Sequence, residues 1–192
     1  MVRPLIRSLV GCLLITSALI SARAELDLTP KPFSYELDGV KFNQLAFSDG
    51  SKIVTYAPPR GWDYSGSAAQ LILQPPGKAQ AEAKITKGTL SQPAGFDEET
   101  VKKLVQEVTA SVPDGSTNVQ LVSQQKNPLM IERKETLLVI LSYNLSGGAF
   151  SRSILFLNRG KEQMRFQLTS RQADFKELQK AFLGSQYSWQ NL

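Results

Sequence analysis

The chain of 192 residues carries 22 lysines and arginines, 17 aspartates and glutamates, one cysteine and no histidine. Catalysis by a Ser-His-Asp or Cys-His arrangement is therefore excluded, and the side chains that usually bind zinc or copper are almost absent. The net charge of +5 is dispersed beside acids, and no phosphate loop or EF-hand spacing occurs, so we expect no nucleic-acid partner, metal or cofactor.

Residues 1–24 have the three parts of a cleavable secretion signal. Arg3 and Arg7 form a basic start, an apolar run covers residues 9–20, and Ala22-Arg23-Ala24 has the small-x-small pattern that signal peptidase accepts. The run is about a dozen residues long, whereas a bilayer-spanning helix needs roughly 20. We therefore expect cleavage after Ala24, a periplasmic or secreted location, and no stable membrane span in the processed chain.

Cys12 lies inside this predicted signal. In a lipoprotein signal the apolar stretch precedes the cysteine, whereas here most of the apolar residues follow it. We interpret Cys12 as one more apolar residue of the signal. Removal of residues 1–24 leaves 168 residues with 19 basic and 17 acidic side chains, a net charge of +2 and no cysteine. A chain of this size buries about 70% of its unfolded surface without disulfides. We expect an extended lead-in over residues 25–36, followed by a single domain over residues 37–192.

Strand signals fill most of the domain. Period-two alternation and turn residues predict strands over residues 40–47, 52–57, 68–74, 80–86, 119–122, 136–145, 150–157 and 163–169. The Ser-Asp-Gly-Ser sequence of residues 48–51 predicts a hairpin turn between the first two. The segment 136–145 is apolar on both faces, which is typical of a central strand.

Two helices are predicted over residues 98–112 and 173–183. The first begins with Asp97 as a cap and with Glu98 and Glu99 in its first turn, where the helix dipole favours negative charge. Each helix has one apolar stripe at helical spacing: Val101, Leu104, Val105 and Val108, then Phe175, Leu178 and Phe182. The order of elements indicates an α+β fold, in which two helices cover an antiparallel sheet.

Two short patterns resemble catalytic motifs but fit structural roles better. Ser123-Gln-Gln-Lys126 matches the Ser-x-x-Lys pattern of penicillin-recognising enzymes, yet it lies on or beside a predicted strand, and the chain has no Lys-Thr-Gly. The acids at residues 97–99 are explained by helix capping rather than by paired catalytic carboxylates. We therefore expect no enzyme, and an enzyme that uses serine, lysine, tyrosine or carboxylate side chains alone stays a third hypothesis.

One loop has the composition of a recognition site. Arg60, Trp62 and Tyr64 follow a double proline, and aromatic residues with arginine are the types that anchor interfaces. We predict these three residues as binding residues. The alternative is that Trp62 folds back and closes one end of the sheet.

The sequence YAPPRGWDY at residues 56–64 resembles the "strand, Pro, x, Gly-Trp" signature near the start of PsbP-like domains. The order of elements and the ending from Ser185 to Trp189 are also similar to that family. The resemblance implies an α/β/α sandwich around an antiparallel sheet. Family members include an extrinsic photosystem subunit, a Ran-binding import factor, chaperones of secretion effectors and bacterial envelope proteins. Metal-binding histidines of the photosynthetic members have no counterpart here.

These observations lead to two main hypotheses. The first is a non-enzymatic protein-binding or accessory protein of the cell envelope, with another envelope protein as its partner. The alternative is a small-ligand carrier with an apolar pocket between sheet and helix, where the small residues Ala79, Ala81 and Ala83 would leave room.

Overall fold

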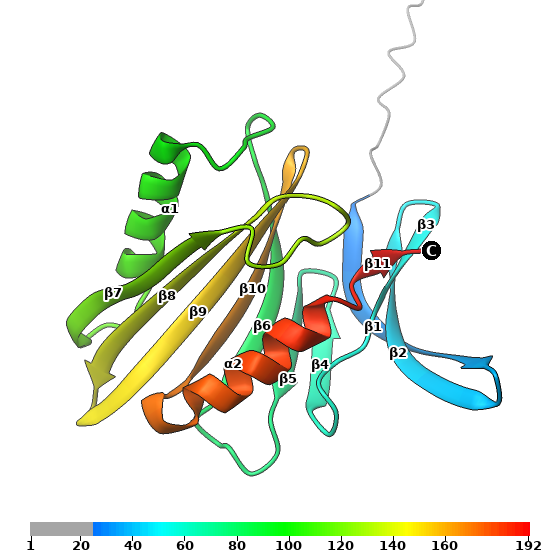
Figure 1. Ribbon diagram of the computed structural model, residues 1–192, viewed down its shortest axis with the longest axis horizontal. Helices are drawn as coiled ribbons and strands as arrows, with labels where there is room; N and C mark the ends of the chain where they lie inside the picture. The colour runs from blue at the N-terminus through cyan, green and yellow to red at the C-terminus, as the bar shows by residue number, and fades with distance from the viewer. Residues whose placement is uncertain (1–24) are drawn as a thin grey trace, which may run out of the picture.

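The computed structural model describes residues 25–192, so the predicted signal peptide with Cys12 lies outside the described residues (Figure 1). In chain order the elements are β1 (Leu26–Leu37), β2 (Val40–Asp49), β3 (Lys52–Tyr56), β4 (Asp63–Ser67), β5 (Gln70–Gln74), β6 (Glu82–Thr89), α1 (Glu98–Ala110), β7 (Thr117–Lys126), β8 (Thr136–Leu145), β9 (Gly148–Arg159), β10 (Glu162–Arg171), α2 (Gln172–Gln186) and β11 (Gln190–Asn191). Antiparallel strands with two helices give the α+β fold class that the sequence predicts. Neither helix in this part of the chain has the length and apolar character needed to cross a bilayer.

The larger of two sheets has seven strands in the order β4-β5-β6-β10-β9-β8-β7, and neighbouring strands are antiparallel. β8 lies between β7 and β9, and most of its residues are buried. The predicted central strand over residues 136–145 is thus confirmed with its bounds unchanged. β7 forms one edge of the sheet and is mostly exposed.

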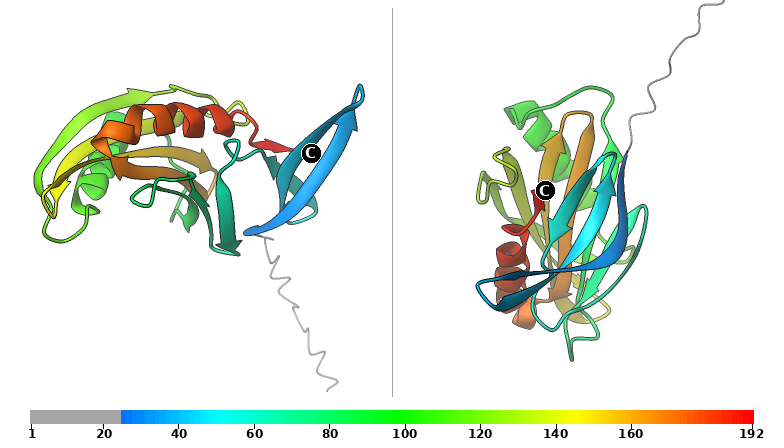
Figure 2. Two further views of the ribbon diagram at one scale, coloured as in Figure 1. Left: turned by 90° about the horizontal axis from the view of Figure 1, so that it is seen from below. Right: turned by 90° about the vertical axis from the view of Figure 1, so that its right-hand side faces the viewer.

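The helices pack on different faces of this sheet (Figure 2). The stripe of α1 contacts alternate residues of β8 and β9, namely Leu137, Val139, Leu141, Ile154 and Phe156. The stripe of α2 belongs to a second cluster that contains the intervening residues Leu138, Leu155 and Leu157. Successive residues of a strand point to opposite faces, so each helix covers its own face of the sheet.

The start of α1 forms as its sequence predicts. The Asp97 side chain accepts a hydrogen bond of 2.8 Å from the backbone N–H of Thr100. This bond holds the pKa of Asp97 below its ordinary value. Val101, Leu104 and Val108 are buried as expected, and the helix ends at Ala110, two residues before its predicted end.

A second, smaller sheet has the strand order β1-β2-β3-β11 and is absent from the sequence prediction. Residues 25–36, predicted as an extended lead-in, instead contribute nearly all of β1, which pairs with β2. Leu26 and Leu28 are fully buried, so this segment belongs to the core. The register shifts between Asp27 and Lys31, and this irregularity together with two prolines hides the alternation that marks a strand.

Trp189 joins the two sheets near the C-terminus. Its side chain is 2% exposed. Its ring lies 5.6 Å from Phe47 and 5.7 Å from Tyr56 of the smaller sheet, and 5.3 Å from Phe166 of the larger one. The core beside α2 is therefore shared by both sheets.

Candidate functional site

An open cavity of about 620 Å³ lies where the two sheets meet. The β2–β3 turn, the β9–β10 turn, the C-terminal strand and the first described residues all contribute to it. Most of its lining residues have polar or charged side chains: Glu25, Leu26, Asp49, Lys52, Thr89, Lys134, Arg159, Gly160, Lys161, Glu162 and Asn191. We take this cavity as the candidate site.

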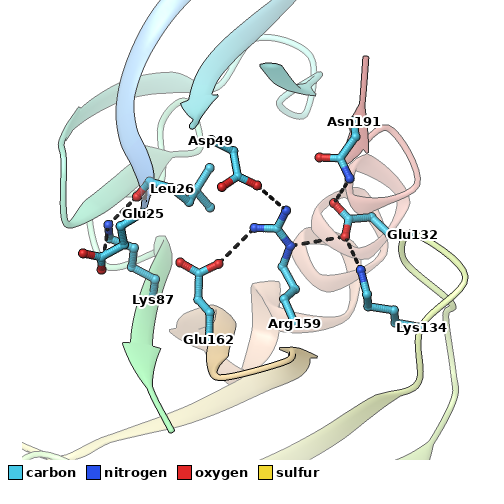
Figure 3. A network of polar contacts seen from close by, with 9 residues as sticks. All are labelled: Glu25, Leu26, Asp49, Lys87, Glu132, Lys134, Arg159, Glu162 and Asn191. Carbon is cyan, nitrogen blue, oxygen red and sulfur yellow. Dashed lines mark hydrogen bonds and ion pairs between the residues drawn. The ribbon is translucent and has the colours of Figure 1, made fainter. Parts of the chain in front are cut away.

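Arg159, at the end of β9, is the centre of an ion-pair network in this cavity (Figure 3). Its guanidinium donates to Asp49 at 2.7 Å, to Glu162 at 3.0 Å and to Glu132 at 3.2 Å. The Arg159 side chain is 10% exposed. Burial would lower the pKa of Arg159, but the hydrogen bond to Asp49 and the three carboxylate charges outweigh burial and raise it. The guanidinium therefore stays charged and tightly held.

Glu132 reaches the network from a tight turn between β7 and β8. Glu132 and Arg133 have φ angles of 51° and 59°. An isolated β-bridge between Ile131 and Lys134 closes the turn. The left-handed region costs roughly 1 kcal/mol or more for each residue other than glycine. The Glu132 carboxylate, 5% exposed, accepts from Arg159, from Lys134 at 2.9 Å and from Asn191 at 3.0 Å. These charge-assisted contacts offset the strain of the turn.

Glu162 is the carboxylate of this network whose pKa is raised. It begins β10, and its ion pair with Arg159 spans the β9–β10 turn. Burial is the largest effect and raises the pKa of Glu162, and the charge of Asp49 adds to it, while Arg159 lowers it. The net result is a pKa above the ordinary value. Although three carboxylates converge here, Arg159 lies among them, and within residues 25–192 no cluster of histidine, cysteine or acidic side chains is arranged to hold a metal ion.

Lys87 of β6 connects the first described residues to the larger sheet. Its ammonium donates to the backbone carbonyl of Leu26 and pairs with the Glu25 carboxylate at 3.0 Å. The Lys87 side chain is 12% exposed. Because Glu25 follows the predicted cleavage position, the first residue of a processed chain would lie at this cavity.

Lys52 and Lys161 are the cations of the lining that form no ion pair with any described residue. Both residues are exposed. In contrast, each carboxylate of the lining is paired with an arginine or a lysine. The lining has four cations against three carboxylates, a net charge of +1, and the Asn191 amide and the Thr89 hydroxyl line the same cavity.

The predicted binding residues Arg60, Trp62 and Tyr64 lie outside this cavity. Trp62 is 9% exposed and stacks on Phe182 of α2, with ring centroids 6.2 Å apart and planes 9° apart. Trp62 is therefore largely buried against α2, as the alternative interpretation of this loop expects, and a binding role for Trp62 is untested. Arg60 and Tyr64 are exposed, and binding by these two stays a prediction.

Two other sequence patterns have structural explanations. Ser123 and Lys126 lie three residues apart in the part of β7 that pairs with β8 without a register shift, so their side chains point to opposite faces rather than along one helix turn. Ala81 and Ala83 are buried in the core cluster that contains the α2 stripe, and neither lines the cavity. These two alanines are therefore part of the packed core, and the carrier with an apolar pocket stays a prediction.

Sequence reasoning missed Arg159, Asp49 and Glu132. The sequence predicts only a turn over residues 48–51 and only a connection between two predicted strands over residues 158–161, and such segments are usually solvated. The sequence gives only weak evidence for this ion-pair network. Opposite charges lie in separate turns, but no local pattern indicates that these turns meet.

No known family model matches the chain, and no curated protein matches its sequence. Among solved structures, the fold is similar to the crystal structure of PA94, a protein of unknown function from Pseudomonas aeruginosa. That likeness has a TM-score of 0.50 at 15% identity and covers 81% of this chain and 94% of that chain. The solution structure of PsbP from Synechocystis sp. PCC 6803 is similar with a TM-score of 0.47 at 8% identity, over 93% of this chain and 99% of that chain. A PsbP is thus among the solved structures that this chain resembles, and the likeness concerns the fold alone.

Proposed function

We propose that this protein is an exported, non-enzymatic accessory protein of the cell envelope, which binds an acidic segment of another envelope protein. The cavity between the two sheets would be the binding site. One observation carries the proposal: Lys52 and Lys161 are unpaired within the described chain, whereas the carboxylates of the lining are all paired. A partly enclosed site with unpaired ammonium groups attracts carboxylates.

The groups of the cavity favour recognition over reaction. Catalysis needs a nucleophile beside a base, or a group free to exchange a proton with substrate. The Arg159 guanidinium is held by three carboxylates, and the Lys87 ammonium is held by Glu25 and the Leu26 carbonyl. Fixed charges of this kind position a partner rather than transform it.

The export and family parts of the proposal have separate support. Export is supported by the signal pattern of residues 1–24 and by the lack of cysteine after it. We further propose that the fold is the α/β/α sandwich of PsbP-like domains in a bacterial envelope form. The packing of α1 and α2 on different faces of the larger sheet supports this arrangement, as does the sequence motif at residues 59–62.

The test measures fluorescence anisotropy of a fluorescein-labelled, glutamate-rich decapeptide titrated with the purified protein. We expect Lys52→Glu/Lys161→Glu to weaken binding about ten-fold or more, because two attractive pairs become repulsive. The matched control is Lys102→Glu/Lys103→Glu, which makes the same charge change at exposed positions of α1. The control should bind within about two-fold of wild type. Equal affinity of wild type and the cavity variant would contradict the proposal.

A second candidate function, a carrier of a small anionic ligand, is favoured by the size of the cavity. Small-molecule sites usually enclose about 300–1,000 Å³, and this cavity has about 620 Å³. Native mass spectrometry of protein purified from its host would then show an additional mass, which Lys52→Glu/Lys161→Glu would remove. Repeated preparations without such a mass, from protein that still binds the peptide, would leave the first function standing and reject the carrier.

A further inference from the structure

The distal half of the β1–β2 hairpin, residues 33–43, projects beyond the rest of the molecule (Figures 1 and 2). We call this segment the arm. β3 pairs with residues 45–49 of β2 only, so the arm is a two-stranded ribbon with no third strand. In its register Tyr35 lies opposite Phe42, and Leu37 lies opposite Val40.

The arm has one apolar face and one polar face. Residues that lie opposite each other in an antiparallel pair share a face, and successive residues alternate. The apolar face consists of Phe33, Tyr35, Leu37, Val40 and Phe42, and the other face consists of Ser34, Glu36, Lys41 and Asn43. Leu37 and Val40 are 58% and 55% exposed, and Tyr35 and Phe42 are each 39% exposed. The rings of Tyr35 and Phe42 stack 5.1 Å apart at 12°.

The apolar face of the arm is not a continuation of the face that the protein buries. Leu45 and Phe47 of β2 point into the core, and the same face of β2 continues outward as Asn43 and Lys41. The large apolar residues of the arm therefore lie on the opposite face of the ribbon. The core formed by residues 25–192 does not cover them, and they form a surface for another molecule.

We propose that a second copy of this chain covers the arm, and that two arms pack apolar face to apolar face around a two-fold axis. The face is self-complementary, because stacked aromatic rings at its centre and aliphatic side chains at its tip can meet the same groups of a copy. It carries no charged side chain, so pairing buries no charge. A lone two-stranded ribbon is marginally stable in water, whereas two stacked ribbons form a small two-layer core.

The charges of the arm argue against a membrane as the occupant. Glu36 and Asp38 at the tip outnumber Lys41, so the arm is slightly negative. Anionic lipid surfaces attract basic segments rather than acidic ones. Two arms, in contrast, meet through their uncharged faces.

The area of the paired faces predicts a weak dimer. The two faces bury on the order of 1,000 Å², the low end of specific interfaces, so we expect a dimer that dissociates on dilution. This inference is independent of the proposed binding in the cavity.

The experiment is sedimentation velocity of the purified protein over a range of concentrations. Wild type should rise from the mass of one chain toward that of two, and Tyr35→Ser/Phe42→Ser should remain a monomer. The matched control Ser34→Ala/Asn43→Ala changes the polar face of the same ribbon and should dimerise as wild type does. Fluorescence of the buried Trp62 and Trp189, remote from these positions, reports that each variant is folded.

A second measurement covers the case in which the arm variant fails to fold. In a Cys12→Ser background, Phe42→Cys should give a disulfide-linked dimer under mild oxidation, and Asn43→Cys on the other face should not. A wild type that is monomeric at every concentration would overturn the proposal, as would equal cross-linking from both faces. A monomeric wild type that sediments with phosphatidylglycerol vesicles would assign the face to a membrane and overturn it as well.

Discussion

The side chains of Arg159 and Asp49 form a 2.7 Å ion pair although the residues are 110 positions apart in the sequence. The pair connects the β9–β10 turn of the larger sheet with the β2–β3 turn of the smaller one. Trp189 joins the same two sheets from inside the core. The two sheets that meet at the cavity are therefore held together by an apolar contact in the core and by an ion pair between their turns.

Loss of Arg159 should destabilise the whole fold. Arg159→Ala leaves Asp49, Glu132 and Glu162 close together without their shared cation, and uncompensated buried charge is costly. We expect a loss of roughly 2–3 kcal/mol of unfolding free energy in urea denaturation, because Asp49 and Glu162 keep 21% exposure and some hydration. Unchanged stability would mean that the network is not formed in solution.

Arg133→Gly, in contrast, should increase the unfolding free energy of the protein. Arg133 is exposed and has a φ of 59°, a conformation that glycine adopts without steric cost. We expect a gain of about 0.5–1 kcal/mol, read from the same denaturation experiment. As a control, Lys103→Gly in the exposed face of α1 should lose about 1 kcal/mol. A destabilised Arg133→Gly would show that the turn is not strained.

Glu162 gives the stability of the protein a pH dependence of defined sign. Its pKa is higher in the folded state than in the unfolded state, so the folded protein holds this proton more tightly. The resulting stabilisation is complete below the unfolded pKa, near 4.3 for a glutamate, and is lost as pH rises through the folded pKa. The unfolding free energy of Glu162→Gln relative to wild type should therefore increase from about pH 4 upward. A constant difference across this range would contradict the raised pKa.

Trp62 and Tyr64 should respond differently to substitution. Trp62→Ala removes a buried ring from its stack on Phe182, and we expect a loss of about 3 kcal/mol. Tyr64 is 44% exposed, so Tyr64→Ala should change stability by less than about 0.5 kcal/mol. Thermal unfolding of both variants checks this contrast. A fully stable Trp62→Ala would contradict the assignment of Trp62 to the core.

Local features of the fold were predictable from the sequence. The cap at Asp97, the stripe of α1 and the apolar residues on both faces of β8 each depend on residues within a few positions of one another. β1 was not predictable, because its bulge and prolines break the alternation. β4 was also missed, since Asp63–Ser67 is short, exposed and rich in turn residues.

The candidate site was harder to predict from the sequence than the fold. Arg159, Asp49 and Glu132 stand in separate turns, and only the meeting of the two sheets brings their charges together. The burial of Trp62, which the sequence offers as the alternative to a binding role, depends on the distant ring of Phe182. Composition alone therefore draws attention to an aromatic loop rather than to a charged cavity.

The central claim is that the cavity between the sheets receives an acidic partner. Its most direct test is a titration of ¹⁵N-labelled protein with the glutamate-rich decapeptide, followed by amide chemical shifts. The account predicts that the largest shifts fall on Lys52, Thr89, Lys161 and Asn191, while residues 60–64 stay unchanged. Shifts centred on residues 60–64, or no shifts in the cavity at saturating peptide, would contradict it.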